Sequence, residues 1–361
     1  MYMVSLDFNN LDKNLIRAWL QEVDPQKLNY LWEKADEIRQ KYVGDDIWLR
    51  GLVEISNHCV RSCAYCGISK CAPVVEKYRM SEDEILTAVK QAADYGFGTV
   101  VLQSGEDMGL TATRITEIIR SIKSKTGLAI TLSLGERSVG DLEDWRKAGA
   151  DRYLLRFETS DVELYKQIHP NTGRQSDRFV QLELMRQMGY EIGTGVMVGI
   201  PGQTWGSLAN DIWLFRKYGM DMIGLGPYLE NEGTPLAGEL GKKLKNSATA
   251  DQVPNDDLTT LKVLALTRIL CPNINIPATT ALATINPEKG RSHALQRGAN
   301  VVMPNLTPHK YRTLYQIYPG KAGLHETAEF SREEIERQII SLGRTIGRGA
   351  GTSSHFKQHC H

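Results

Sequence analysis

Short apolar runs alternate with amphipathic stretches along most of this chain. Eight runs have the length, the β-branched content and the polar or glycine ends of strands, at residues 51–56, 99–104, 128–134, 151–158, 191–199, 222–228, 273–280 and 300–305. Amphipathic stretches that end on glycine, such as 81–96 and 113–127, separate many of these runs. All but one of the runs precede a recognisable helix, a pattern that predicts an α/β fold of the TIM-type (β/α)8 barrel class. A six-stranded partial barrel and an open doubly wound sheet are the alternatives.

The two ends of the chain do not share this alternation. Residues 8–50 carry Leu, Ile, Trp and Tyr at helical spacing, and Gly44 ends the second of two helical stretches. The polar segment 238–258 is predicted to be a loop within the barrel. We therefore predict three parts: an N-terminal helical extension over 1–50, the barrel over 51–345 and a weakly ordered C-terminal tail over 346–361.

Composition narrows the classes of function. Lys plus Arg and Asp plus Glu both number 43 in the 361 residues, so no excess of positive charge favours a nucleic-acid or anionic-membrane partner. No uncharged apolar window is long enough to span a membrane, and no basic flank precedes an apolar stretch at the N-terminus. We therefore expect a cytoplasmic protein. Structural disulfides are uncommon in that compartment, so clustered cysteines indicate a metal or redox site.

Three of the six cysteines, Cys59, Cys63 and Cys66, form a C-x3-C-x2-C motif directly after the first predicted strand. In a (β/α)8 barrel the chemistry takes place at the C-terminal ends of the strands, where this motif falls. Zinc would need a fourth ligand, and the candidate His58 is adjacent to Cys59, a poor geometry for completing a tetrahedron. Three thiolates instead suit a [4Fe–4S] cluster with one iron left open to bind a ligand. Reduced, idle thiols are the remaining alternative.

The motif resembles that of the radical S-adenosylmethionine (SAM) superfamily, in which an aromatic residue, here Tyr65, precedes the third cysteine. The resemblance implies a barrel of the radical SAM type, with Cys59, Cys63 and Cys66 as the catalytic ligands of one [4Fe–4S] cluster. It also implies that the open iron binds the amino and carboxylate groups of SAM. One electron from the reduced cluster then cleaves SAM and yields a 5′-deoxyadenosyl radical.

The same resemblance assigns SAM contacts to polar residues after later strands. Ser104, Gly105 and Glu106 match the turn that meets the SAM amino group, and Glu158 closes the fourth run. Arg178, at a predicted helix start, can hold the SAM carboxylate bidentately. An ordinary glycine turn and a surface ion pair of Arg178 are the alternatives.

Residues at two further strand ends have two interpretations each. Met197 and Val198 close the fifth run and can pack on the adenine of SAM, or belong to the core. Thr279 and Thr280 close the seventh run, where their hydroxyls can bind a carboxylate or cap a helix.

Two arginines of the fourth run point to an anionic substrate. Arg152 and Arg156 lie four residues apart, so they share one face of a strand with a period of two. Inward arginines in a barrel are costly unless they meet an anion. The pair therefore suggests a substrate that bears a carboxylate.

Beyond the superfamily, the chain resembles the HydE family, the radical SAM maturases of [FeFe]-hydrogenase. The likeness covers roughly residues 30–321 and rests on segments such as "TLSLGE", "MVGIPGQT", "NIPATTA" and "YRTLYQIYPGK". The chain is similar, less closely, to methylornithine synthase and more distantly to biotin synthase. The HydE resemblance implies a full barrel with a deep active site. It places the substrate near Gln103, Ser133, Arg156, Thr279, Thr280 and Tyr311.

The HydE resemblance also implies a reaction and its partners. The adenosyl radical attacks the sulfur of a cysteine-ligated Fe(CO)2CN complex that HydG delivers, in the pathway to the H-cluster that also includes HydF. A flavodoxin or ferredoxin would supply the electron, and we expect a monomer. Many HydE proteins carry further cysteines after "YPGK" for an auxiliary cluster, whereas here Cys71, Cys271 and Cys360 lie far apart. We therefore expect one cluster only.

Three other functions stay open from the sequence. One is a lysine mutase of the methylornithine synthase type, and another is a HydE-like enzyme that acts on a different thiol or thioether. The third belongs to another class, a non-catalytic iron–sulfur carrier or scaffold. A carrier would have no need of Glu106, Glu158 and Arg178.

Overall fold

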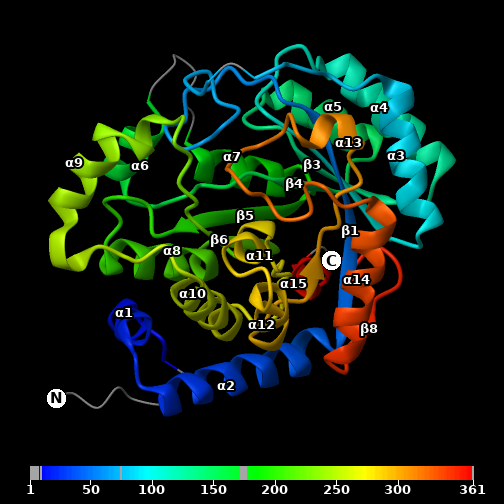
Figure 1. The fold of residues 1–361 in the computed structure, drawn as a ribbon. Helices are drawn as coiled ribbons and strands as arrows, with labels where there is room; N and C mark the ends of the chain where they lie inside the picture. Colours follow the sequence, from blue (N-terminus) through cyan, green and yellow to red (C-terminus); the bar gives the residue numbers. More distant parts are fainter. Residues whose placement is uncertain (1–7, 9, 74, 171–176, 360–361) are drawn as a thin grey trace.

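The computed structural model describes residue 8 and residues 10–73, 75–170 and 177–359 (Figure 1). Within these residues, parallel strands form one sheet in the order β6-β5-β4-β3-β2-β1-β7, with β8 beside the start of β1. The strands are β1 (Asp46–Ser56), β2 (Thr99–Ser104), β3 (Ala129–Ser133), β4 (Arg152–Leu154), β5 (Glu191–Val198), β6 (Met222–Pro227), β7 (Val301–Val302) and β8 (Thr345–Ile346).

Residues 275–278 close this sheet into a barrel between β6 and β7. Single bridges join Met222 to Asn275 and Pro277 to Val301. The Ala278 amide also donates to the carbonyl of Val301 at 2.9 Å. Pro277 has no amide hydrogen to add to a ladder, which explains why this predicted run lies in a strand position without being a regular strand. The predicted (β/α)8 barrel is therefore confirmed.

Amphipathic helices cover the outside of the barrel, and several begin at a side-chain cap. Ser81, Thr111 and Ser138 each accept a hydrogen bond from the backbone of the helix that follows. The outer helices are α3 (Glu82–Asp94), α4 (Ala112–Lys125), α5 (Val139–Ala148), α6 (Val162–Ile168), α7 (Arg178–Gln187), α8 (Trp205–Lys217), α10 (Asp257–Leu270), α11 (Thr280–Ile285), α12 (Gly290–Gln296) and α14 (Ala328–Ser341). Among the described helices, none has the length and apolar character needed to cross a membrane.

The segment 238–258, predicted to be a loop, contains the helix α9 (Glu239–Ala248). Its sequence is mostly polar, and only Leu240 and Leu244, one turn apart, pack against a small apolar cluster. A single apolar pair is a weak periodic signal, which is why the sequence pattern missed this helix.

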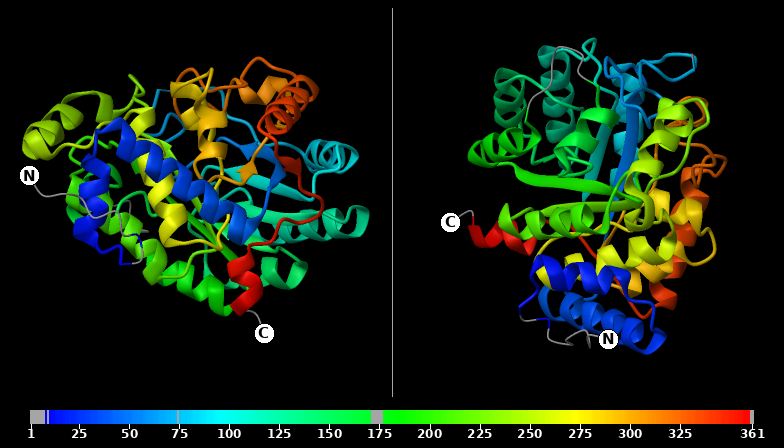
Figure 2. Two further views of the ribbon diagram at one scale, coloured as in Figure 1. Left: turned by 90° about the horizontal axis from the view of Figure 1, so that it is seen from below. Right: turned by 90° about the vertical axis from the view of Figure 1, so that its left-hand side faces the viewer.

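The helices predicted over residues 8–50 are present as α1 (Lys13–Gln21) and α2 (Pro25–Val43). They pack on α8 and α10, and α2 faces the viewer in the left view of Figure 2. Ile16, Trp19 and Leu20 of α1 are fully buried, so this extension shares the core of the barrel. The predicted boundaries at 50 and 345 stay predictions. In the structure, β1 begins at Asp46 and β8 spans Thr345–Ile346.

The C-terminal tail packs across the N-terminal end of the barrel, contrary to the prediction that it is weakly ordered. The Ala350 carbonyl accepts hydrogen bonds from Arg152 and Thr99, both at 2.9 Å. The Gly351 carbonyl accepts one from Arg50 at 3.0 Å. After these residues the chain forms α15 (Ser354–His359). Backbone carbonyls of the tail therefore satisfy arginines that the barrel buries.

Arg152 does not share the surroundings of Arg156, which corrects the interpretation that both face a substrate anion. The Arg152 guanidinium forms a buried ion pair with Glu191 of β5. Four residues span about 13 Å along a strand, so side chains on one face can lie at opposite ends of a barrel. The anion that Arg152 meets belongs to the protein itself.

Changing Arg152 to Met should destabilise the protein strongly. The substitution leaves the carboxylate of Glu191 buried without its cation, a change that costs about 3–5 kcal/mol. We expect a clear fall in the midpoint of urea unfolding, followed by circular dichroism. Lys147→Met is the matched control, because Lys147 pairs with Glu143 at 3.6 Å on the surface, and such pairs contribute about 0–1 kcal/mol. Equal midpoints for the two variants would contradict the structural role of Arg152.

Candidate functional site

The three motif cysteines lie in the loop that follows β1, at the C-terminal end of the barrel strands (top of Figure 1). Backbone hydrogen bonds fasten this loop to distant segments. The Ala64 amide donates to Ile168 and the Gly67 amide donates to Ile317, both at 2.8 Å. The Lys70 amide donates to the Arg61 carbonyl at 2.8 Å, which closes the loop on itself around the cysteines.

The donor set of this loop fits a cluster better than a single metal ion. Burial raises the pKa of Cys59, Cys63 and Cys66, in the case of Cys66 to about 12. In the part of the chain that the structure describes, no three His, Cys, Asp or Glu side chains gather closely enough to hold one ion. A [4Fe–4S] cluster needs no such gathering, because each thiolate binds a different iron. Three thiolates in one loop suit such a cluster.

The turn after β2 packs directly on the first cysteine. A Cβ atom at Gly105 would lie 2.3 Å from the His58 carbonyl oxygen and 2.8 Å from the Cys59 Cβ, so only glycine fits there. The Glu106 amide donates to Cys59 Sγ at 3.4 Å. The Ser104 hydroxyl donates to the Gly105 carbonyl at 2.6 Å. The structure thus brings the predicted Ser104–Glu106 turn and the cysteine loop together.

Glu158, after β4, is the described non-glycine residue with a left-handed backbone, at φ 63°. Such a conformation costs about 1–3 kcal/mol and often marks a functional site. The side chain is nearly buried, and its Oε1 accepts a hydrogen bond from Arg156 Nε at 2.9 Å. Its Oε2 is buried without a hydrogen-bond partner. A buried carboxylate oxygen in this state suits a ligand with an ammonium group or hydroxyls, as SAM has.

Arg178 begins α7 and is nearly buried, with 12% of its side chain exposed. Its Nε donates to Glu136 Oε1 at 3.0 Å, and its Nη1 donates to the Arg156 carbonyl. Arg178 and Cys63 line one small pocket. The surface ion-pair alternative for Arg178 does not hold, because its partner Glu136 is buried and Arg178 is nearly so.

Tyr65 and Met197 both pack against one small apolar cluster, and the Tyr65 hydroxyl is hydrogen-bonded to His169 Nε2 at 2.9 Å. Val198 is fully buried in the main core instead. Successive side chains of a strand point to opposite sides, so Met197 and Val198 cannot share one ligand face. The prediction that Val198 packs on adenine has no support in the structure. No spacing in the sequence marks His169, which reaches Tyr65 only through the packing of α6.

The structure places Gln103, Ser133 and Arg156 at the ends of β2, β3 and β4, and Thr279 and Thr280 directly after residues 275–278. Gln103 and Ser133 are register partners on β2 and β3. Arg156 donates to the carbonyls of Val196 at 2.7 Å and Gly224 at 3.2 Å. The Thr279 hydroxyl donates to the Leu225 carbonyl at 2.7 Å.

The capping interpretation of the two threonines can also be tested against the structure. Thr279 occupies the N-cap position of α11, but its side chain makes no capping hydrogen bond. Thr280 is the first residue of that helix and is partly exposed.

The structure does not bring Tyr311 to this group of residues. Its hydroxyl donates to Glu84 Oε1 at 2.9 Å, at the start of α3, and its ring stacks on Tyr78. Tyr315 instead accepts a hydrogen bond from Gln103 at 3.4 Å. Tyr318 hydrogen-bonds Thr284 and lies near Arg156, and burial raises its pKa. The motif "YRTLYQIYPGK" contains all three tyrosines, and only the path of the chain decides which of them face the barrel.

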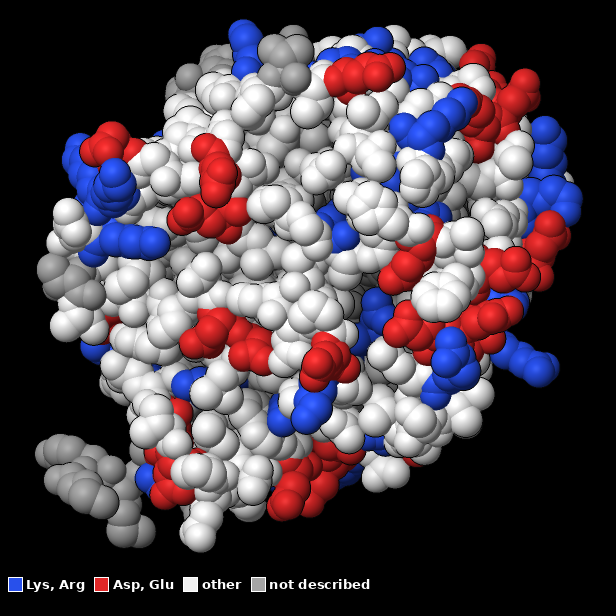
Figure 3. Space-filling view, viewed as in Figure 1, with Lys and Arg blue, Asp and Glu red and all other residues white. Residues whose placement is uncertain are grey.

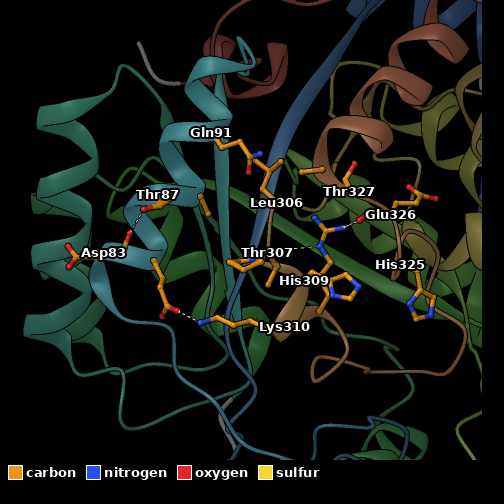
Figure 4. Close-up of a pocket in the computed structure, with 15 residues that line it drawn as sticks. Asp83, Thr87, Gln91, Leu306, Thr307, His309, Lys310, His325, Glu326 and Thr327 are labelled. Atoms are coloured by element: carbon orange, nitrogen blue, oxygen red, sulfur yellow. Dashed lines mark hydrogen bonds and ion pairs between the residues drawn. The ribbon is translucent and has the colours of Figure 1, made fainter.

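A separate groove of about 590 Å³ lies outside the barrel, between α3, residues 306–312 and residues 325–328 (Figure 4). Lys310 pairs with Glu84 at its edge, at 2.7 Å, and Arg312 donates to the carbonyls of Thr307 and Glu326. Its lining includes none of the motif cysteines or predicted SAM residues. On the face shown in Figure 3, basic and acidic side chains are interspersed, which agrees with the balanced composition.

Comparison with known proteins agrees with this geometry. Residues 53–212 match the family model described as the radical SAM superfamily. The chain is 44% identical over 321 residues to the [FeFe] hydrogenase maturase subunit HydE of Thermotoga maritima, covering 89% of this chain and 88% of that protein. It is 28% identical over 331 residues to 3-methylornithine synthase of Methanosarcina acetivorans, covering 91% and 86% respectively.

Two solved structures share the fold over nearly the whole chain. The crystal structure of methylornithine synthase (PylB) aligns with a TM-score of 0.76 and 25% identity, over 94% of this chain and 95% of that chain. The hydrogenase maturase HydG from Carboxydothermus hydrogenoformans aligns with a TM-score of 0.78 and 20% identity, over 97% and 79% respectively.

Proposed function

Because this chain belongs to the HydE family of radical SAM enzymes, we propose that it acts in the maturation of [FeFe]-hydrogenase. The observation that carries this proposal is the 44% identity to a HydE protein over 89% of the chain. The proposed substrate is a cysteine-bound Fe(CO)2CN precursor of the H-cluster, a small complex that presents both a carboxylate and a sulfur atom. Glu158 Oε2 is buried without a hydrogen-bond partner, and this unpaired acceptor supports the use of SAM.

In the proposed site, the cysteines would bind the cluster, and Glu158 and Arg178 would bind SAM. Cys59, Cys63 and Cys66 would hold one [4Fe–4S] cluster, which when reduced supplies the electron that cleaves bound SAM to methionine and a 5′-deoxyadenosyl radical. Glu158 Oε2 would accept from the SAM ammonium or ribose hydroxyls, and the remaining N–H groups of Arg178 would hold its carboxylate.

Two side chains and one backbone turn would complete the SAM site. Met197 and Tyr65, which pack against the same apolar cluster, would give the adenine an apolar contact surface. Ser104, Gly105 and Glu106 would contribute mainly through the backbone of their turn, because the Glu106 carboxylate already accepts from Arg61 and from the Glu136 amide, both at 3.0 Å.

Arg156 would link the two halves of the site. Its Nε pairs with Glu158 on the SAM side, while its Nη atoms reach β5 and β6. Glu158 already balances the charge of Arg156, so a substrate carboxylate would bind through the remaining Nη hydrogens of its guanidinium. The polar groups proposed to bind the rest of the substrate are those of Gln103, Ser133, Thr279, Thr280, Tyr315 and Tyr318.

The proposal extends to partners and location. HydG would deliver the substrate, HydF would act in the same pathway, and a flavodoxin or ferredoxin would supply the electron to a monomeric, cytoplasmic enzyme. We propose one cluster only. Cys71 is exposed and Cys271 is buried in the core. Cys360 lies outside the described residues.

Co-expression tests the proposed function. The chain should restore hydrogen evolution by an apo-hydrogenase expressed with HydF and HydG in a host without HydE. An authentic HydE on the same vector is the positive control, and Cys63→Ala in this chain is the negative control. Failure of this chain where HydE succeeds would move the function to the alternative that the PylB likeness favours, a lysine mutase. Formation of methylornithine from lysine would identify that activity.

A further inference from the structure

Four charged side chains surround the base of the cysteine loop, and we refer to Arg61, Glu106, Glu136 and Arg178 as the charge cluster. The first three are buried and Arg178 is nearly so. Arg61 Nε donates to Glu106 Oε2 at 3.0 Å, and Arg61 Nη2 pairs with Glu136 Oε2 at 2.5 Å. Arg178 Nε donates to the other oxygen of Glu136 at 3.0 Å. The two arginines therefore share the carboxylate of Glu136, one on each oxygen.

Each member comes from a different part of the barrel rim. Arg61 lies between Cys59 and Cys63, and Arg178 begins α7. Glu106 and Glu136 follow β2 and β3. The charge cluster thus ties the cysteine loop to the residue proposed to bind the SAM carboxylate.

The backbone before Glu136 is built for this contact. Gly135 has φ 78°, and a Cβ atom there would lie 2.8 Å from Glu106 Oε2. A side chain at position 135 would collide with the charge cluster and strain the turn. The Glu136 amide in turn donates to Glu106 Oε2 at 3.0 Å. The turn therefore fixes Glu136 by its backbone as well as by its carboxylate.

We propose that Glu136 is a positioning residue that holds Arg178 in the orientation that binds the SAM carboxylate. The inference rests on the proposed function of Arg178. A guanidinium is planar with five N–H groups, so contacts at two of its nitrogens fix its plane. Glu136 holds Nε and the Arg156 carbonyl holds Nη1, and in the described contacts the other N–H groups are left to bind a ligand.

Glu136 also sets the charge beside the cysteines. Its carboxylate compensates Arg61, which sits inside the C-x3-C segment. Without that carboxylate, the local charge becomes more positive, which favours the reduced state of a cluster held there because reduction adds negative charge. Loss of Glu136 should therefore act on SAM binding and on the reduction potential together.

The test is the Glu136→Gln variant, reconstituted with its cluster under anaerobic conditions. Glutamine keeps the shape and one acceptor oxygen but loses the charge. We expect the KM for SAM to rise about 10–100-fold, as when an outer partner of a binding residue is lost, with kcat at saturating SAM little changed. Iron content should match wild type, and the reduction potential should shift upward. Glu143→Gln on the surface of α5 is the matched control and should change none of these values.

Arg178→Ala separates failure of this inference from failure of the proposed function. If it raises the KM for SAM and Glu136→Gln does not, Glu136 has no positioning role, while the function of Arg178 stands. If neither variant changes the KM, the assignment of Arg178 itself fails. Glu136→Asp keeps the charge and should restore part of the SAM affinity with normal iron content. Loss of iron in both the Gln and Asp variants would overturn the proposal in favour of a purely structural role.

Discussion

Changing Cys63 to Ala will abolish SAM cleavage and leave the barrel folded. Three thiolates are the least that hold a [4Fe–4S] cluster with one open iron, so two cannot keep it in place. The loop itself does not depend on the thiol, because the amides of Ala64, Gly67 and Lys70 fasten it. The measurements are iron per chain, 5′-deoxyadenosine and methionine formed after reduction with dithionite, and the thermal midpoint.

Cys71→Ala is the matched control for this prediction. Cys71 belongs to the same loop but is exposed and outside the C-x3-C-x2-C motif. It should retain about four irons per chain and full turnover, like the wild type. Turnover retained in Cys63→Ala, or lost equally in Cys71→Ala, would refute the assignment of the cluster. About eight irons in the wild type would instead reveal a second cluster.

Changing Glu158 to Gln should weaken SAM binding by about 10–150-fold. A hydrogen bond to a charged group contributes about 1.5–3 kcal/mol, and each 1.4 kcal/mol is tenfold in affinity. Glutamine has the same shape, meets the same backbone strain at φ 63° and keeps an acceptor oxygen for Arg156 Nε, so the fold and the cluster should persist. The KM for SAM in 5′-deoxyadenosine formation reports the effect.

Glu163→Gln is the control for the Glu158 variant. Glu163 lies five residues further along, exposed on α6 and paired only with Lys166 in the described contacts. It should leave the KM for SAM unchanged. If Glu158→Gln also leaves the KM within about twofold of wild type, then the open oxygen of Glu158 does not face SAM, and another explanation of its strained backbone is required.

Much of the fold and part of the site could be predicted because their signals are local. The strands of the barrel appear as short apolar runs, and the helix starts appear as caps such as Ser81 and Thr111. The spacing of Cys59, Cys63 and Cys66 is fixed by the covalent chain and does not depend on how the chain folds. These features depend on residues within a few positions of one another.

Charge partners were the part that the sequence could not supply. Arg152 and Arg156 look equivalent by periodicity, yet one meets Glu191 and the other meets Glu158. Nothing local marks Glu136 as the carboxylate shared by Arg61 and Arg178. The partners of Arg152, Arg61 and Arg178 are set by which loops meet when the barrel closes, whereas Arg156 pairs with Glu158 only two residues further along the chain.

The sequence by itself determined that this protein is a barrel with a cysteine loop after its first strand, and that it resembles the HydE family. The tertiary structure alone decided that the segment with Pro277 closes the barrel without forming a regular strand. It also decided that the C-terminal tail covers the N-terminal end of the barrel. Finally, it decided that Tyr315, and not Tyr311, contacts Gln103 in the interior. The physical reason is the range of the interactions. Periodicity and capping act over one or two turns. The burial of charges and the direction of side chains depend on contacts between segments that lie from tens to hundreds of residues apart, such as Arg152 with Glu191 and Arg50 with Gly351.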